Sequence, residues 1–190
     1  MASRHEAPVP KVPQLHFAPE GYISDTSPKL FEQFIDFLHS AGFNPDELLF
    51  CGTDAEIILN KDGGLKPSPA GIFVMNQAGW LRSAKDHEST PASYADKEGG
   101  SQPCIALYDR SQLADVANYQ VRMEDETDYS SGVTPVDILP GPALTDYPLD
   151  KVIDELVIHK DYPNAVPSDA LVGVVLLEEE KLYLEEEPGF

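Results

Sequence analysis

The chain has 190 residues, 42% of them hydrophobic, which is enough for one domain with a substantial core. Its formal net charge is −20, from 33 acidic and 13 basic residues. This charge argues against nucleic acid or an anionic membrane surface as a partner, because both would repel the chain, whereas a basic or mixed-charge protein is compatible with it. Acidity of this degree also serves solubility alone, and the composition does not choose between the two.

No apolar run approaches the ~20 residues of a membrane span. The N-terminal sequence MASRHEAPVPKVP has no apolar region of the kind found in secretory signals. We therefore expect the protein in the cytoplasm, or secreted into a host cell without a conventional signal peptide. The two cysteines, Cys51 and Cys104, lie in apolar runs and are predicted to be free and buried rather than paired. The five histidines show no metal-ligand spacing, so no metal is expected.

Residues 1–13 are polar and rich in proline, which predicts a loosely held arm. Ser27 and Pro28 then have the order of an N-cap and a first helical residue. The helix that follows is predicted to be amphipathic and to end at Gly42. Residues 1–45 are thus an arm and a helix, either an appendage with a partner-binding face or a layer on the sheet. Residues 46–190 are predicted to form the main domain.

Apolar runs bounded by glycine and proline predict the strands of the main domain. Residues 77–97 are expected to be helical in parts, and residues 124–148 form a polar segment expected to be a long functional or mobile loop. Many short strands and few helices indicate an α+β domain with a split, mainly antiparallel sheet. The predicted strands are residues 48–51, 71–75, 103–108, 118–123, 155–158 and 170–177.

Residues 50–74 read FCGTDAEIILNKDGGLKPSPAGIFV: an apolar strand ending in Gly-Thr, a short helix, a Gly-Leu pair and a second strand. This order resembles the donor-binding half of the ADP-ribosyltransferase superfamily, in its poly(ADP-ribose) polymerase-like branch, and the resemblance spans residues 47–178. The matching residues are Phe50, Cys51, Gly52, Thr53, Ile58, Leu59, Gly64, Leu65, Gly71, Ile72, Phe73 and Val74. Two of them depart from the family, since Cys51 stands where it has histidine and Phe73 where it has tyrosine.

The resemblance implies a transferase that uses NAD as co-substrate, releases nicotinamide and adds one ADP-ribose unit to a protein. Glu155, which opens a strand after the long loop, matches the catalytic glutamate. Breaking the nicotinamide–ribose bond builds positive charge on the ribose, and a preorganised carboxylate stabilises that charge. Asp154 alternates to the opposite face of the strand. Spacing alone does not distinguish Glu155 from the other acidic residues of the chain, which has 33 in all. On that interpretation Glu155 is a solvated residue at a strand edge.

The resemblance also implies that Cys51, Gly52 and Thr53 bind the donor, with backbone groups near Gly52 holding the nicotinamide amide. A thiol is a weak hydrogen-bonding group, so Cys51 does not replace the family's histidine. Tyr94 matches an aromatic residue that lies against nicotinamide, with a core tyrosine as the alternative, and Phe73 can stack but not hydrogen-bond. Asp54 is either the N-cap of the short helix or a ligand of a ribose hydroxyl.

Two other functions remain open from the sequence. One is a catalytically inactive module of the same fold that binds a protein or an ADP-ribose-like ligand, which the departures at Cys51 and Phe73 favour. The other is an acidic domain that binds a basic partner through its surface. If the chain is an enzyme, its acceptor is expected to be a basic or mixed-charge protein. Ubiquitin is a candidate because divergent bacterial effectors of this family modify it.

Overall fold

The structure is a computed structural model whose described residues are 11–59, 72–97, 102–112, 118–122, 137–140, 155–158 and 170–179. Only the backbone is described for residues 72, 73 and 97 and for the strands at 118–122, 137–140 and 155–158. Within the described parts of the chain, no helix is both long and apolar enough to span a membrane.

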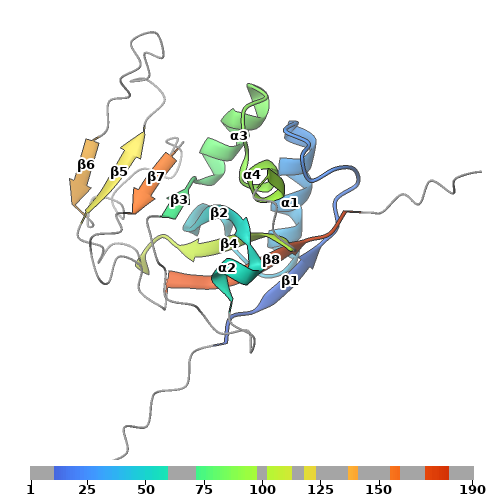
Figure 1. Cartoon of the computed structure of the whole chain (residues 1–190), viewed down its shortest axis with the longest axis horizontal. Coiled ribbons are helices and arrows are strands. Elements are labelled where there is room, and N and C mark those ends of the chain that lie inside the picture. The colour runs from blue at the N-terminus through green and yellow to red at the C-terminus, as the bar shows by residue number, and fades with distance from the viewer. Residues whose placement is uncertain are drawn as a thin grey trace, which may run out of the picture.

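The first four-stranded sheet has the order β1-β8-β4-β2 (Figure 1). It comprises β1 (Gln14–Phe17), β2 (Leu48–Asp54), β4 (Pro103–Asp109) and β8 (Leu171–Leu177). β2 and β8 are both antiparallel to β4, and β1 adds to β8 in parallel. β4 lies inside the sheet and its residues 104–108 are all buried, as the continuous apolar run PCIALY predicts for a strand covered on both faces.

The second four-stranded sheet has the order β3-β7-β5-β6. It comprises β3 (Ile72–Val74), β7 (Glu155–Ile158), β5 (Asn118–Arg122) and β6 (Asp137–Pro140). All of its neighbouring strands are antiparallel. The mixed helix and strand content and the mostly antiparallel pairing agree with the α+β class expected from the sequence.

Each predicted strand is a strand in the structure, with small shifts at its ends, and β1 and β6 were not predicted. β6 falls within residues 124–148, so the expectation of an uninterrupted loop is wrong at Asp137–Pro140. Four residues that read DILP give no periodic signal, and their pairing with β5 supplies the hydrogen bonds of the strand. Some predicted features lie outside the described residues. They are residues 1–10, the Gly64-Leu65 pair and the remainder of residues 124–148.

Four helices accompany the sheets: α1 (Pro28–Ser40), α2 (Ala55–Ile58), α3 (Gln77–Lys85) and α4 (Pro91–Lys97), and a 3₁₀ turn at Pro45–Glu47 precedes β2. α1 begins and ends where the sequence predicts. Gly42 follows it with φ of +88°, in the left-handed region that favours glycine. Ser27 occupies the N-cap position, but its hydroxyl donates to Asp25 at 2.8 Å instead of capping the helix.

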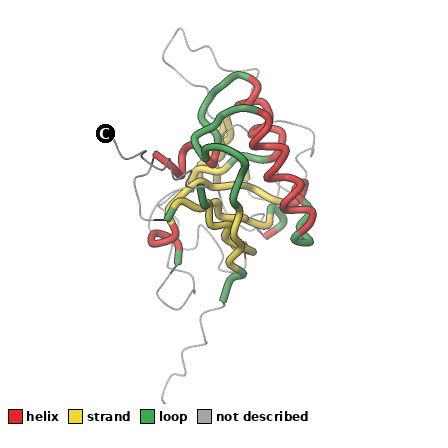
Figure 2. Tube along the Cα trace, turned by 90° about the vertical axis from the view of Figure 1, so that its right-hand side faces the viewer, coloured by secondary structure: helices red, strands yellow, loops and turns green. Residues whose placement is uncertain are grey.

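One face of the first sheet packs against α1, α3 and α4. Figure 2 shows the long helix α1 along one side of the strands. Phe34 of α1 is fully buried and contacts three aromatic rings from different elements. Its ring centroid lies 5.3 Å from that of Phe17 in β1, 6.0 Å from that of Phe50 in β2 and 4.9 Å from that of Trp80 in α3. Residues before and after position 45 therefore share one sheet and one core.

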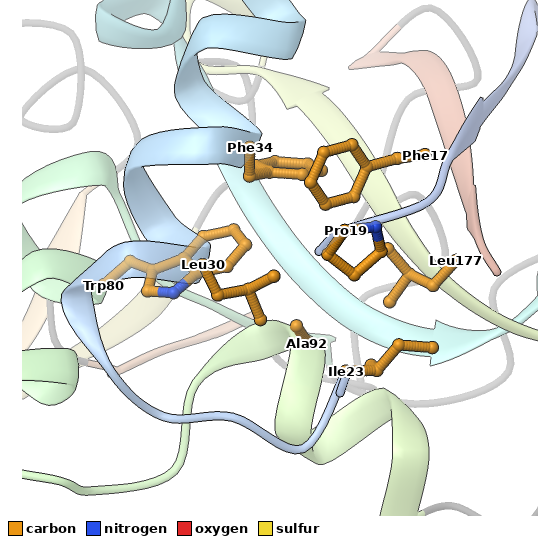
Figure 3. A pocket seen from close by; sticks show the side chains of 8 residues that line it. All are labelled: Phe17, Pro19, Ile23, Leu30, Phe34, Trp80, Ala92 and Leu177. Atoms are coloured by element: carbon orange, nitrogen blue, oxygen red, sulfur yellow. The ribbon is translucent and has the colours of Figure 1, made fainter. Parts of the chain in front are cut away.

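A small apolar gap lies where these elements meet (Figure 3). It is too narrow to hold a water molecule and has no polar lining, so it is part of the core and not a ligand site. Its lining residues are Phe17, Pro19, Ile23, Leu30, Phe34, Trp80, Ala92 and Leu177.

Replacing Phe34 with alanine should destabilise the whole protein. The substitution leaves a cavity among three aromatic partners, and a Phe-to-Ala change in a core costs about 3–5 kcal/mol. Denaturant unfolding should show this loss in a single transition. Lys29→Ala, at an exposed position of the same helix, should change stability by no more than about 0.5 kcal/mol. A second transition, or a loss comparable to that of Lys29→Ala, would show that α1 does not share the core.

Candidate functional site

The two sheets are joined at one backbone pairing between β2 and the residue that follows β3. The Phe50 amide donates to the Met75 carbonyl at 2.8 Å, and the Met75 amide donates to the Phe50 carbonyl at 3.1 Å. We call this pairing the sheet junction. Beyond it the strands part into their separate sheets, since β2 continues beside β4 and β3 continues beside β7.

The register of β3 and β7 brings the start of β7 to the sheet junction. Val74 is opposite Leu156, the residue that follows Glu155 in β7. Phe50 of β2 thus pairs with the residue after β3, and β3 pairs with the strand that begins at Glu155. The start of β7 and β2 are separated by one chain segment, residues 72–75.

Most of the candidate site residues lie at or next to this junction. Cys51, Gly52, Thr53 and Asp54 are the last four residues of β2. Phe73 is the middle residue of β3, and Glu155 is the first residue of β7. The backbone thus gathers the end of β2, β3 and the start of β7. The side chains of residues 73 and 155 are outside the described atoms.

The close packing of helix α4 on β2 requires a glycine at position 52. A Cβ at Gly52 would lie 2.0 Å from the carbonyl oxygen of Pro91 and 3.1 Å from the amide nitrogen of Ala95. A glycine at the end of a strand can let a ligand approach the backbone, but here the group that approaches its Cα is the first turn of α4. Any ligand contact at Gly52 would have to use the strand's own N–H or C=O.

The first turn of α4 is held by a reciprocal pair of hydrogen bonds that the sequence analysis did not identify. The Thr90 amide donates to Ser93 Oγ at 2.9 Å, and the Ser93 amide donates to Thr90 Oγ1 at 3.2 Å. Both residues are buried. The signal was present, because Thr90 stands before Pro91 as Ser27 stands before Pro28, a pattern typical of helix starts.

Tyr94 projects from α4 with 45% of its surface exposed, so it is not the core tyrosine that the sequence left as an alternative. Its amide donates to the Thr90 carbonyl at 2.9 Å, which keeps it within the regular helix. α4 packs on Gly52 through Pro91 and Ala95, and Tyr94 belongs to the same helix with its side chain open to solvent.

Asp54 is the N-cap of α2, one of the two roles expected for it. Its Oδ1 accepts the Glu56 amide at 2.8 Å, and its Oδ2 accepts the Gln102 amide at 3.0 Å. The residue is only 2% exposed. Because each carboxylate oxygen already holds a backbone amide, Asp54 anchors the end of β2 to the start of β4. Its alternative role at a ribose hydroxyl gains no support, and Glu155 is left as the catalytic candidate.

Both cysteines are free, as the sequence predicts, but they differ in exposure. Cys104 is fully buried, and burial raises the pKa of its thiol to about 12, with negative charge at Cys51 and Asp54 adding to the effect. Its thiol therefore stays protonated and unreactive at neutral pH. Cys51 is half-buried, so it is less buried than the sequence predicts. Its Sγ lies 3.8 Å from the Gly52 carbonyl oxygen.

Among the residues with described side chains, no three His, Cys, Asp or Glu side chains gather closely enough to hold a metal ion. Comparison of the chain with models of protein families, with curated proteins and with solved structures finds no match.

Replacing Gly52 with alanine should lower stability by about 2–3 kcal/mol, because a Cβ there overlaps a backbone carbonyl that has no freedom to rotate away. Gly173→Ala is the matched control in the same sheet. A Cβ at Gly173 would meet only the side-chain ends of Leu107 and Phe43, each at 3.3 Å, and these can shift. Urea unfolding of both variants tests the contact, and equal midpoints would refute the close approach of α4 to β2.

Proposed function

We propose that this chain is an NAD-dependent mono-ADP-ribosyltransferase that modifies a protein, with the strand and helix of residues 14–40 built into the same domain as the residues after 45. The observation that carries the proposal is the sheet junction. It joins β2, which ends in Cys51-Gly52-Thr53-Asp54, to the residue after β3, and β3 pairs with β7, which opens at Glu155. The resemblance to the family assigns the start of β7 to catalysis and the end of β2 to donor binding.

The proposed reaction needs one carboxylate in this place. The bond between the ribose C1′ and the nicotinamide nitrogen breaks, and its electron pair leaves with nicotinamide. A nucleophile of the acceptor forms the new bond to C1′ and loses its proton. Glu155 would stabilise the positive charge that develops on the ribose, and would orient or deprotonate the nucleophile.

The chain's own groups favour the nicotinamide half of NAD over the adenosine half. Backbone groups near Gly52 would hold the nicotinamide amide, and the exposed ring of Tyr94, on the helix that packs on Gly52, would lie against the nicotinamide. Phe73 would add an apolar contact. Cys51 replaces the histidine that binds the adenosine-side ribose in the family, and its thiol is a poor substitute.

Transfer of a single unit fits this set of residues better than chain elongation. Glu155 is present without the histidine and tyrosine that accompany it in the family, since Cys51 and Phe73 stand in their places. With a formal net charge of −20, the chain would attract a basic or mixed-charge acceptor. Ubiquitin is the first acceptor to assay, because divergent effectors of this family modify it.

A catalytically inactive module of the same fold is the second candidate. Two observations favour it: Cys51 supplies only a weak hydrogen-bonding group, and Pro91 already occupies the space beside the Cα of Gly52. Such a module would bind a protein or an ADP-ribose-like ligand without turnover. Nicotinamide release therefore separates the two candidates.

Glu155→Gln should abolish transfer and leave the fold intact. Glutamine has nearly the same shape, so packing changes little, but the negative charge that opposes the developing oxocarbenium ion is lost. Loss of a preorganised electrostatic group of this kind lowers rates by about 10²–10³-fold. The measurements are nicotinamide release and a mass-spectrometric search for a one-unit ADP-ribose adduct on ubiquitin and on basic proteins.

Asp154→Asn serves as the control, because strand alternation predicts that residues 154 and 155 face opposite sides. It should keep its activity, and both variants should unfold at the wild-type temperature. Full activity in Glu155→Gln would mean that another carboxylate is responsible, and the acidic residues at 124–126 would be examined next. No nicotinamide release by the wild-type protein with any acceptor would favour the inactive module.

A further inference from the structure

We propose that Arg122, the last residue of β5, is a positioning residue for Glu155, the first residue of β7. Its positive charge pairs with the glutamate and holds the carboxylate in the ionised form and orientation that transfer requires. The catalytic part of this inference rests on the transferase proposed above, whereas the pairing of the two charges does not. No motif in the sequence connects Arg122 with Glu155.

The strand register sets these two residues opposite each other. β5 and β7 are antiparallel, and their register pairs Gln120 with Val157 and Arg122 with Glu155. Figure 1 draws the two strands side by side. Directly opposite residues of an antiparallel pair share one face of the sheet, with Cβ atoms about 4.5–5.5 Å apart. The register therefore gives a basic and an acidic residue adjacent positions on one face.

The two faces of the second sheet differ in polarity. Along β3, β7 and β5, the register assigns one face only apolar and aromatic residues, namely Ile72, Val74, Tyr119, Val121, Leu156 and Ile158. Val74 is only 3% exposed, which indicates that this face is the buried one. The opposite face carries every polar residue of the three strands except the tyrosine, and it also carries an apolar pair. Its residues are Asn118, Gln120, Arg122 and Glu155, with Phe73 and Val157.

Arg122 is the cation that this face offers to Glu155. Among the described strands of the second sheet, which read IFV, ELVI, NYQVR and DILP, it is the one basic residue. The chain has 33 acidic and only 13 basic residues, so a carboxylate has few cations available to pair with it. A guanidinium is well suited to this role, because its planar fork can hold a carboxylate by two parallel hydrogen bonds.

The proposed reaction explains why such a partner is useful and why its effect is limited. Glu155 must be ionised and held in one orientation to stabilise the charge that develops on the ribose. An opposite charge on the neighbouring strand favours both conditions. The same positive charge also opposes the charge on the ribose, so the gain from positioning is partly offset. We therefore expect an effect of about ten-fold on the rate, smaller than that of Glu155 itself.

Exchange of the two charges tests the pairing without turnover. Arg122→Glu sets two acidic residues opposite each other, and Glu155→Arg sets two basic residues opposite each other. Each should lower the thermal midpoint by about 2–4 °C, because like charges in opposite positions are destabilising. The double exchange restores unlike charges and should recover most of the loss. A double variant that is no more stable than the sum of the single losses predicts would overturn the pairing.

Asn118→Glu is the matched control, since it adds an acidic residue to the same strand and the same face. Position 118 is four residues from Arg122, about 13 Å along the strand, which exceeds the screening length of about 8 Å at physiological salt. Glu155→Arg should therefore have the same effect on the thermal midpoint in the Asn118→Glu background as in the wild type. Equal recovery in this background would show that the effect belongs to net charge, and would overturn the pairing.

Steady-state kinetics of nicotinamide release test the positioning role. Arg122→Gln should lower kcat about ten-fold and leave the KM for NAD unchanged, because the interaction acts on the reacting carboxylate. Arg122→Lys keeps the charge and should recover most of the rate. A raised KM for NAD with an unchanged kcat would overturn the positioning role, since Arg122 would then bind the phosphates of the donor.

The two measurements separate this inference from the proposed function. If the double exchange restores stability but the wild type never releases nicotinamide, the charge pairing stands, and the transferase and the positioning role both fail. If the wild type releases nicotinamide and Arg122→Gln keeps its kcat, the transferase stands and the positioning role fails.

Discussion

The two hydrogen bonds between Phe50 and Met75 are the constraint on which the candidate site depends. The two sheets have separate strand orders. The Phe50–Met75 pairing joins β2 of one sheet to the residue after β3 of the other. Because β7 pairs with β3, the same contact leaves only one chain segment between β2 and the strand that begins at Glu155. The proposed catalytic glutamate and the proposed donor-binding residues could lie far apart in a split sheet, and this contact limits their separation.

Contacts of Phe50 and of Asp54 hold the second half of β2 in place. The ring of Phe50 packs against Phe34 and Trp80, with centroid distances of 6.0 and 5.6 Å, while its backbone joins the sheets. Four residues later, Asp54 ties the strand to α2 and to the start of β4 through two backbone amides. Between Phe50 and Asp54, the first turn of α4 packs directly against Gly52. The residues that would bind NAD are therefore fixed by the core and need little reordering on binding.

The sequence predicted those elements whose signal is local. The apolar stripe of α1, the Ser27-Pro28 start and the glycine-bounded strands are set by side-chain periodicity and backbone preference, and they are present. β6 was missed because its four residues are ordered by pairing with β5 and not by their own pattern. The resemblance implied a ligand at Gly52, but a sequence does not show that Pro91 occupies the space beside its Cα. The role of Glu155 came from the resemblance, and it stays a prediction; the structure shows only that its strand, β7, pairs with β3.

The central claim is that the end of β2, β3 and the start of β7 together form the NAD site. Hydrogen exchange of backbone amides, followed by mass spectrometry with and without NAD, tests it directly and needs no turnover. The account predicts that saturating NAD slows exchange in peptides that cover residues 50–54, 72–75 and 155–158, with nicotinamide alone protecting the first two groups and ADP-ribose giving weaker protection. Protection confined to other segments, or none at saturating NAD, would contradict the claim.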